Sequence, residues 1–294
     1  MDNMTAKMSA FARAYHYKNN ETYVFADSKA EMILGDNYEK IAASLVQGIP
    51  FFLPNYQGTE EEGLRKIVDG QISPSVLARS AYCEKMLQNE RKLGCRQYIL
   101  FASGYDTYSV RNKENSLRVF ELDLPEMLED KKDRTGKAGL DSDAVYVPCD
   151  LSETGWAEKL ISRGFDANVK SFGSLLGITY YLQKQDFESL LQRISALMVQ
   201  GSAICFDYQT VDESTVTKKN ETLAAGAGEQ MKAAYSLDEL ELILQNCGFL
   251  IYEHLNHEEM TEQYFEDYNA KNPGHIMQAP EGVGYMLAVK GKQE

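Results

Sequence analysis

Apolar positions in the first third of the chain recur at helical spacing. Three segments show the pattern: MTAKMSAFARAYHY, SKAEMILGDNYEKIAASLVQ and SPSVLARSAYCEKMLQNERKL. Residues three and four positions apart lie on one face of a helix, so each segment predicts an amphipathic helix. In the third, Ser73 and Pro74 fit an N-cap and a first helical residue. The stretch GIPFFLPNYQGTEEEG between the second and third helices, with Pro50, Pro54 and Gly58, predicts a loop.

From Gln97 onward the period changes. Short apolar runs predict strands at QYILFAS, LRVFELD, AVYVPCD, SFGSLLG, SAICFDY, FLIYEHL and GYMLAVK. Helical segments lie between the later ones, at TGWAEKLISRG, QKQDFESLLQRISALMVQ and SLDELELILQNCG. Strands that alternate with amphipathic helices predict an α/β fold with a mainly parallel, doubly wound sheet. The last two strands lack a clear helical crossover, which suits an antiparallel edge pair. No element is assigned to 256–282, and 209–234 predicts either a helical lid or a surface loop.

Composition and charge narrow the class of protein. The 294 residues are 44% hydrophobic and 25% charged, enough for one large α/β domain, with or without a lid. The formal net charge of -14 argues against a nucleic-acid partner. No apolar run reaches the ~18 residues of a membrane span, and the first 20 residues lack a secretion-signal layout. Five scattered cysteines without a CxxC pair fit a reduced protein, so we expect a cytoplasmic protein without a membrane partner.

The turn after the first strand, FASGYDT, has the composition of a ligand-binding turn. Gly104 permits backbone conformations closed to other residues, and Ala102 and Ser103 are the next smallest choices. Asp106 or Thr107 can cap the following helix, whose positive end faces the ligand space. A tight strand-to-helix turn without a ligand accounts for this segment equally well.

Polar or small residues follow the next three strands as well. Asp123 stands roughly 20 residues after the glycine turn, where nucleotide-binding folds place the acid that accepts ribose hydroxyls, with Glu121 as the second choice. Asp150 and Leu151 can hold an adenine, and Gly177 marks a turn after the fourth strand. Asp123 and Asp150 can alternatively cap the helices that follow them. Ligands bind at the carboxyl ends of parallel strands, and this order of residues predicts a nucleoside site there.

These segments resemble the leucine carboxyl methyltransferase family. The likeness is carried by ARSAYCEKML, YILFASGYDTYSVR, VFELDLPE, VPCDLSETGWAEKLISRGFD and LLGITYYLQKQDFESLL, and it extends to both ends of the chain. The resemblance, which is to the bacterial polyketide-type O-methyltransferase branch, implies a class I methyltransferase that uses S-adenosylmethionine and releases S-adenosylhomocysteine. It implies a Rossmann-like, seven-stranded, mostly parallel sheet with helices on both faces, an antiparallel last strand and an N-terminal helical cap. The implied division is a cap over 1–92 and a cofactor-binding domain over 93–294, with a lid-like insertion near 209–234.

The resemblance also implies a cofactor site. The family turn LGAGLDTR is here FASGYDTY, so Ala102 replaces a glycine and Ser103 an alanine. Arg79 matches an arginine that clamps the cofactor carboxylate, because an arginine can pair with it in bidentate fashion. Leu176 stands where the family pattern EGVLMYL has a glutamate. The implied cofactor-binding set is Arg79, Ala102, Ser103, Gly104, Asp106, Thr107, Asp123, Leu124, Asp150, Leu151, Leu176 and Gly177.

The expected activity is O-methylation of a carboxyl group on a small molecule or peptide. A carboxylate is ionised at neutral pH and needs no general base, which fits a sequence without a catalytic triad. No catalytic residue is therefore assigned, and the oligomeric state is left open. The cluster EHLNHEEM, with His254 and His257, is interpreted as a solvated connection, so no metal is expected. Two alternatives stay open: an NAD(P)-dependent Rossmann oxidoreductase, and a non-catalytic protein that binds S-adenosylmethionine.

Overall fold

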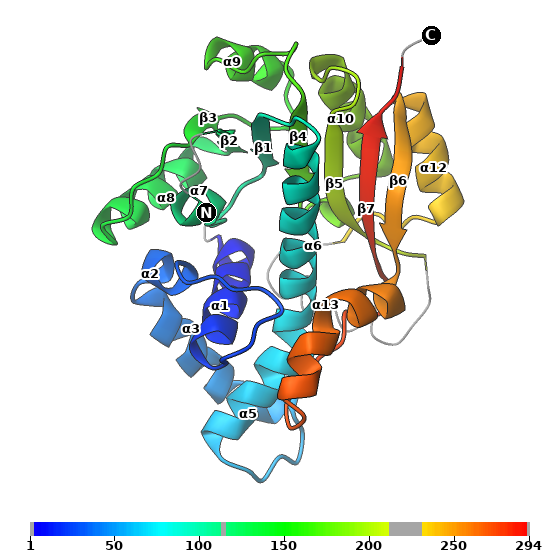
Figure 1. The fold of residues 1–294 in the computed structure, drawn as a ribbon. Helices are drawn as coiled ribbons and strands as arrows, with labels where there is room; N and C mark the ends of the chain where they lie inside the picture. Colours follow the sequence, from blue (N-terminus) through cyan, green and yellow to red (C-terminus); the bar gives the residue numbers. More distant parts are fainter. Residues whose placement is uncertain (1–2, 113–115, 212–230, 293–294) are drawn as a thin grey trace.

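The computed structural model describes residues 3–112, 116–211 and 231–292, which build one seven-stranded sheet flanked by helices (Figure 1). All seven predicted strands are present, each within a few residues of the expected bounds. They are β1 Gln97–Phe101, β2 Arg118–Asp123, β3 Val145–Pro148, β4 Ser171–Leu175, β5 Ala203–Gln209, β6 Phe249–Leu255 and β7 Val283–Lys290.

The strands stand in the order β3-β2-β1-β4-β5-β7-β6. β1 pairs in parallel with β2 and β4, and β5 continues the parallel run beside β4. β7 is antiparallel to both β5 and β6, so the last strand lies inside the sheet and only β6 forms that edge. The Rossmann-like fold with an antiparallel last strand is confirmed. Strand order reverses between β1 and β4, which is where such sheets bind ligands.

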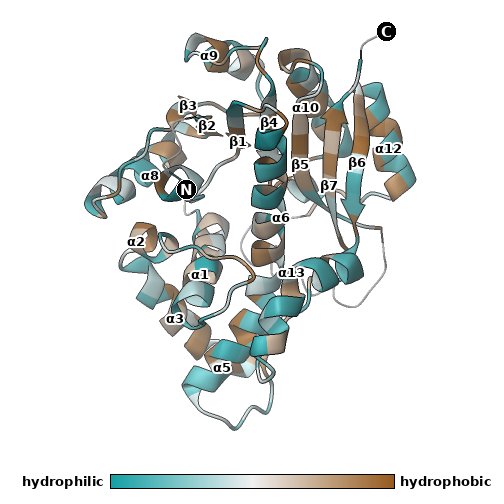
Figure 2. Ribbon diagram, in the orientation of Figure 1, coloured by the Kyte–Doolittle hydropathy of each residue, from teal (hydrophilic) through white to brown (hydrophobic). Residues whose placement is uncertain are grey.

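Two layers of helices cover the sheet. On one face, α9 Trp156–Ser162, α10 Lys184–Leu197 and α12 Leu237–Asn246 bury an apolar cluster that includes Trp156, Phe187 and Leu240. On the other face, α6 Ser73–Lys92 and α13 His257–Lys271 bury Leu77, Phe265 and Tyr285. The short helix α7 Tyr108–Arg111 follows β1, and α8 Pro125–Lys137 packs on β2 and β3. Figure 2 shows hydrophobic stretches along β5 and β7, the strands covered by these layers.

The N-terminal third is helical, as expected, and lies below the sheet in Figure 1. Its elements are α1 Met4–Lys18, α2 Ala30–Leu34, α3 Asn37–Gln47, α4 Ile49–Phe52, α5 Glu60–Ile67 and a π-helical segment η1 Val68–Ile72. The predicted single helix over 28–47 is broken, because Gly35 adopts a φ of +53° between α2 and α3. The predicted loop over 48–63 was wrong in part, since it contains α4 and the start of α5. Thr59 and Glu62 form a capping box there.

Three further expectations need correction or comment. Ser73 is the first residue of α6 rather than its N-cap, because η1 runs directly into the helix. The unassigned segment 256–282 contains α13, which begins after its N-cap Asn256 and is stabilised there by a capping box with Glu259. Most of the predicted lid, 212–230, lies outside the described residues.

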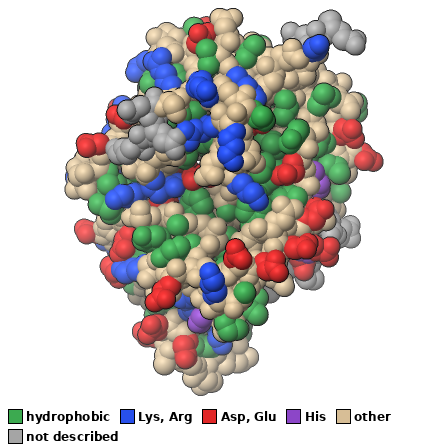
Figure 3. Space-filling view, in the orientation of Figure 1, with side chains coloured by type: hydrophobic (Ala, Val, Ile, Leu, Met, Phe, Trp, Pro, Cys, Tyr) green, Lys and Arg blue, Asp and Glu red, His purple; other side chains and the backbone are tan. Residues whose placement is uncertain are grey.

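The visible surface is unevenly charged. Figure 3 shows Lys and Arg side chains gathered in the upper half of the view, with Asp and Glu side chains mainly in the lower half and along the right edge. Within the described ranges, no helix is long and apolar enough to cross a membrane.

Candidate functional site

The turn after β1 uses left-handed backbone at two positions. Ala102 has a φ of +53° and Gly104 a φ of +47°. Ser103 donates its N–H to the carbonyl of Leu122 at 3.0 Å, and Asp106 donates its own to the carbonyl of Ser103 at 2.9 Å. An L-residue rarely adopts a positive φ, so Ala102 is strained where a glycine would be relaxed. The chain bends sharply over the carboxyl end of β1.

The hydroxyl of Ser103 points to a missing partner. Ser103 is 6% exposed, and its Oγ has no hydrogen-bond partner among the residues that the structure describes. Buried hydroxyls are nearly always hydrogen-bonded, so the Ser103 hydroxyl keeps an unused hydrogen-bonding capacity at the cavity wall. A ligand with a polar group beside this turn would satisfy it.

The carboxylate of Asp123 lies across from the turn. Its Oδ2 accepts the N–H of Gly104 at 2.7 Å, and its Oδ1 accepts the N–H of Leu124 at 2.8 Å. Burial raises the pKa of Asp123, while these two backbone hydrogen bonds oppose the shift. Each oxygen keeps a free lone pair, so the carboxylate can accept a further pair of hydroxyl donors.

Arg79 on α6 lies against the turn after β4. Its Nη1 donates to the hydroxyl of Tyr180 at 2.9 Å, and its Nη2 donates to Oγ of Ser9 at 3.1 Å. Gly177 has a φ of +71°, and a Cβ there would lie 2.8 Å from Cζ of Arg79. Glycine is therefore needed at 177 both for its backbone conformation and for the close approach of the guanidinium.

A cavity of about 510 Å³ joins these groups. Its wall is formed by α1, α6, the turn after β1, the start of α8 and the turn after β4, at the point where strand order reverses. The predicted site residues that line it are Arg79, Ala102, Ser103, Gly104, Asp106, Asp123, Leu124, Leu176 and Gly177.

The other three predicted residues lie outside this cavity wall. Thr107 is buried and donates from its Oγ1 to Asp27 at 2.6 Å. Asp150 accepts the N–H of Ser152 at 2.8 Å in a local turn and does not cap α9, whose N-cap is Gly155, and Leu151 packs against the apolar core. Their roles toward a cofactor stay predictions.

Helix α1 contributes a wall that the motif analysis did not assign. Thr5, Ala6, Ser9 and Arg13 all line the cavity from α1. Arg13 donates from Nε to Asp27 at 2.9 Å and from Nη2 to the carbonyl of Tyr105 at 2.8 Å, which ties α1 to the turn after β1. The spacing of apolar residues predicts that α1 is a helix. The same spacing does not indicate which part of the protein the polar side chains of α1 face.

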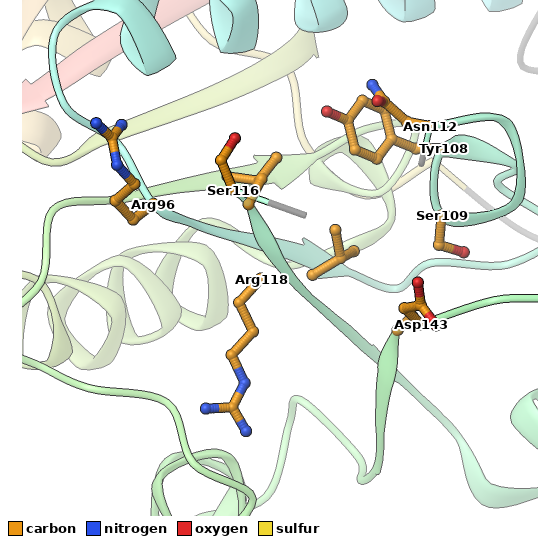
Figure 4. A pocket seen from close by; sticks show the side chains of 10 residues that line it. Arg96, Tyr108, Ser109, Asn112, Ser116, Arg118 and Asp143 are labelled. Carbon is orange, nitrogen blue, oxygen red and sulfur yellow. The ribbon is translucent and has the colours of Figure 1, made fainter. Parts of the chain in front are cut away.

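A second cavity, of about 390 Å³, lies at the opposite, amino ends of β2 and β3 (Figure 4). Arg118 there already donates to the carbonyls of Gly164 and Arg163, and Ser109 donates to the buried Glu121. The guanidinium groups of Arg96 and Arg118 lie apart from each other in Figure 4. These groups do not converge on a common point, so we assign no function to this cavity.

The cluster EHLNHEEM is divided between two elements. His254 lies in β6, and its Nε2 is 2.9 Å from the hydroxyl of Tyr208. His257 is the first residue of α13, and Glu259 forms the capping box of that helix with Asn256. Across the described residues, no group of three His, Cys, Asp or Glu side chains is placed to hold a metal ion.

Comparison with known proteins agrees with this geometry. The model of a family described as leucine carboxyl methyltransferase matches residues 6–195. A protein of Bacillus subtilis (strain 168), named "Putative S-adenosyl-L-methionine-dependent methyltransferase YktD", is 35% identical over 98% of this chain and 97% of its own length.

Solved structures with the same fold are much more distant in sequence. A DUF574 family protein of Streptomyces avermitilis has a TM-score of 0.55 at 12% identity, over 84% of this chain and 97% of its own. A magnesium protoporphyrin IX methyltransferase of Synechocystis, solved with S-adenosylhomocysteine, has a TM-score of 0.50 at 9% identity, over 89% of this chain and 99% of its own. Identities this low support the fold alone.

The sheet order, together with a relative that is 35% identical over nearly the whole chain, identifies a class I methyltransferase that depends on S-adenosylmethionine. Within that class, the chain belongs to the leucine carboxyl methyltransferase family. S-Adenosylmethionine is its cofactor, and the unpartnered Ser103 hydroxyl beside the Asp123 carboxylate fits the polar groups of that molecule. The dinucleotide-dependent oxidoreductase alternative is not retained.

Proposed function

We propose that the enzyme methylates a carboxyl oxygen of a small molecule or peptide. The observation that carries the proposal is the chemistry of the cavity wall. Its described residues include no histidine or cysteine, and both of its carboxyl groups, Asp106 and Asp123, already accept backbone N–H bonds. Burial raises the pKa of Tyr105 to about 12, so this phenol is not a base either. An acceptor that is already ionised needs none of these groups, and a carboxylate is such an acceptor.

Cationic side chains of the wall also favour an anionic acceptor. Arg13, Arg79 and Lys232 all line the cavity. The two arginines pair with Asp27 and Asp207, whereas no ion pair of Lys232 occurs among the described residues. An unpaired ammonium group beside a cavity attracts a carboxylate and lowers the entropic cost of its alignment.

The proposed mechanism depends on alignment and on exclusion of water. S-Adenosylmethionine supplies an electrophilic methyl group when it is bound. The Asp123 carboxylate would accept the two ribose hydroxyls of the bound cofactor, and the Arg79 guanidinium would bind the carboxylate of its methionine part. The small residues Ala102, Ser103 and Gly104 allow close approach of the backbone, and α1 shields the site from bulk water.

The stability of the product to alkali tests this function. The enzyme is incubated with methyl-tritiated S-adenosylmethionine and a panel of carboxylic acids, peptides, phenols and amines. Methyl esters release labelled methanol in mild alkali, whereas methyl ethers and N-methyl groups do not. We expect volatile, alkali-released label from carboxylic acids only. Alkali-stable label would contradict carboxyl methylation, and cofactor binding without any transfer would favour the non-catalytic alternative.

We further propose that the division of the chain separates two tasks. Residues 1–92 would act as a cap that selects the acceptor, and 93–294 would bind the cofactor together with Arg79, which the cap contributes. The insertion near 209–234 would complete the acceptor side, although its central part lies outside the described residues.

A further inference from the structure

Asp207 is a buried acid that lies behind the cavity wall. It stands near the carboxyl end of β5, and its residue exposure is 1%. It is not one of the residues that line the cavity. Burial of a carboxylate costs several kcal/mol unless it is paired, so its partners indicate why it is there.

The Asp207 side chain joins two parts of the wall. Its Oδ1 accepts the N–H of Gly177 at 2.7 Å, and its Oδ2 accepts the hydroxyl of Tyr180 at 3.2 Å. Nη1 of Arg79 lies 3.5 Å from the same Oδ2. One carboxylate therefore contacts both the turn after β4 and the guanidinium that lies over that turn.

The same contacts leave little freedom to Arg79. Tyr180 donates to Asp207 and accepts from Arg79, and burial keeps its hydroxyl protonated by raising its pKa well above the ordinary value. The guanidinium lies directly against the backbone of Gly177, since a Cβ at this position would meet Cζ of Arg79. The side chain of Arg79 therefore cannot move further toward the turn. The side chain of Arg79 is only 13% exposed. A guanidinium fixed in this way loses little entropy when it binds a carboxylate.

We propose that Asp207 is a positioning residue, which fixes Arg79 and the Gly177 turn in the geometry that receives the carboxylate of the methionine part of the cofactor. This inference rests on the proposed role of Arg79. It assigns to Asp207 an effect on ligands that carry this carboxylate and no effect on ligands that lack it.

Two ligands separate this role from a merely structural one. S-Adenosylhomocysteine carries the amino-acid carboxylate, whereas 5′-deoxy-5′-methylthioadenosine keeps the nucleoside and the sulfur but lacks it. Calorimetry gives the affinity of each ligand for the wild type and for Asp207→Asn, which preserves size and removes the charge. We expect the affinity for S-adenosylhomocysteine to fall at least about 10-fold. The affinity for methylthioadenosine should stay within about 2-fold.

Three further variants make every outcome decisive. Arg79→Met should reproduce the selective loss; if it leaves the affinity for S-adenosylhomocysteine unchanged, the role of Arg79 itself is wrong. If Arg79→Met loses affinity for S-adenosylhomocysteine and Asp207→Asn does not, the inference about Asp207 is wrong while the role of Arg79 stands. An equal loss of affinity for both ligands in Asp207→Asn would also contradict the inference.

If Asp207→Asn does not fold, Tyr180→Phe replaces it as the test, because this variant removes the hydroxyl that bridges Asp207 and Arg79. An equal effect on the two affinities, or no effect, would then contradict the inference. Tyr208→Phe, on the same strand but bonded to His254, is the matched control.

Discussion

At the scale of single residues, Ala102 is the point where sequence and backbone conflict. The family turn has glycine there, and the structure gives Ala102 a φ of +53°. A left-handed conformation costs an L-residue about 1–2 kcal/mol, while an added glycine costs about 0.4–1 kcal/mol through the unfolded chain. The departure from the family pattern was visible in the sequence. Whether alanine at 102 raises or lowers the free energy of unfolding, however, depends on the backbone angle, which only the structure gives.

Ala102→Gly should therefore raise the free energy of unfolding, by about 0.5–1 kcal/mol. Denaturant titration of the apoprotein measures this change. Ala43→Gly on the exposed side of α3 is the matched control, because glycine inside an ordinary helix destabilises by about 1 kcal/mol. A loss of stability in both variants would show that Ala102 is not strained.

Asp123 leads to a prediction about pH. Burial raises its pKa, so it takes up a proton at a higher pH than an ordinary aspartate. Ribose hydroxyls need the ionised form as acceptor, so affinity for S-adenosylhomocysteine should be full above this raised pKa and fall as pH drops through it. Asp123→Asn should bind about 10–100-fold more weakly at neutral pH. The affinity of Asp123→Asn should also no longer fall as the pH drops. If it falls at low pH as in the wild type, the pH dependence belongs to another group.

At the scale of elements, the placement of α1 depends on one buried ion cluster. Asp27 accepts hydrogen bonds from Arg13 and Thr107 and from the backbone N–H groups of Lys29 and Ala30, and Arg111 lies 3.4 Å away. These contacts join α1, the start of α2 and the turn after β1. Although burial opposes ionisation, Arg13 and Arg111 hold the pKa of Asp27 below its ordinary value.

Asp27→Asn should cost about 3 kcal/mol of stability, because it leaves the buried Arg13 guanidinium without its counter-charge and leaves Arg111 with Glu84 alone. The folded pKa is lowered, so this contribution is present above the unfolded pKa of about 3.9 and is lost as pH falls through the folded value. Urea titrations at neutral and acid pH measure it. Glu266→Gln, at an exposed position of α13, should change stability by less than about 0.5 kcal/mol. A comparably small effect at Asp27 would contradict the role given to the cluster.

At the scale of the whole molecule, the cavity combines distant parts of the chain. Its wall includes residues from Asn3, at the start of α1, to Lys232 beyond β5. A ligand bound there contacts the helical part and the sheet at once. Such a ligand stabilises the folded state of both parts by mass action.

S-Adenosylhomocysteine at 100 times its Kd should therefore stabilise the protein by about 2.7 kcal/mol. Thermal unfolding followed by fluorescence should show one transition that moves to higher temperature with ligand concentration. NADH at the same concentration should leave it unchanged, because the turn after β1 has no second phosphate cradle. A rise of the unfolding temperature with NADH but not with S-adenosylhomocysteine would contradict the methyltransferase assignment and favour an oxidoreductase.

Local patterns were enough to predict the strands, because each is a short apolar run bounded by turn residues. They also predicted the small-residue turn and the acid after β2, since both lie at strand ends. The hydrophobic pattern gave wrong predictions where the chain changes direction within a few residues. Gly35 divides one predicted helix in two, and α4 forms around Pro50 in a predicted loop. A short helix fixed by its neighbours leaves little periodic signal.

The amino-acid order thus decides which elements form and which chemistry stands at their ends, because both depend on neighbours along the chain. Tertiary packing decides which side chains meet. Asp27 and Asp207 are ordinary acids in the sequence, and only folding brings Asp27 to Arg13 and Asp207 to Arg79. Because these pairs are buried, removal of one partner leaves a charge without compensation in a place that water does not reach, which destabilises the fold.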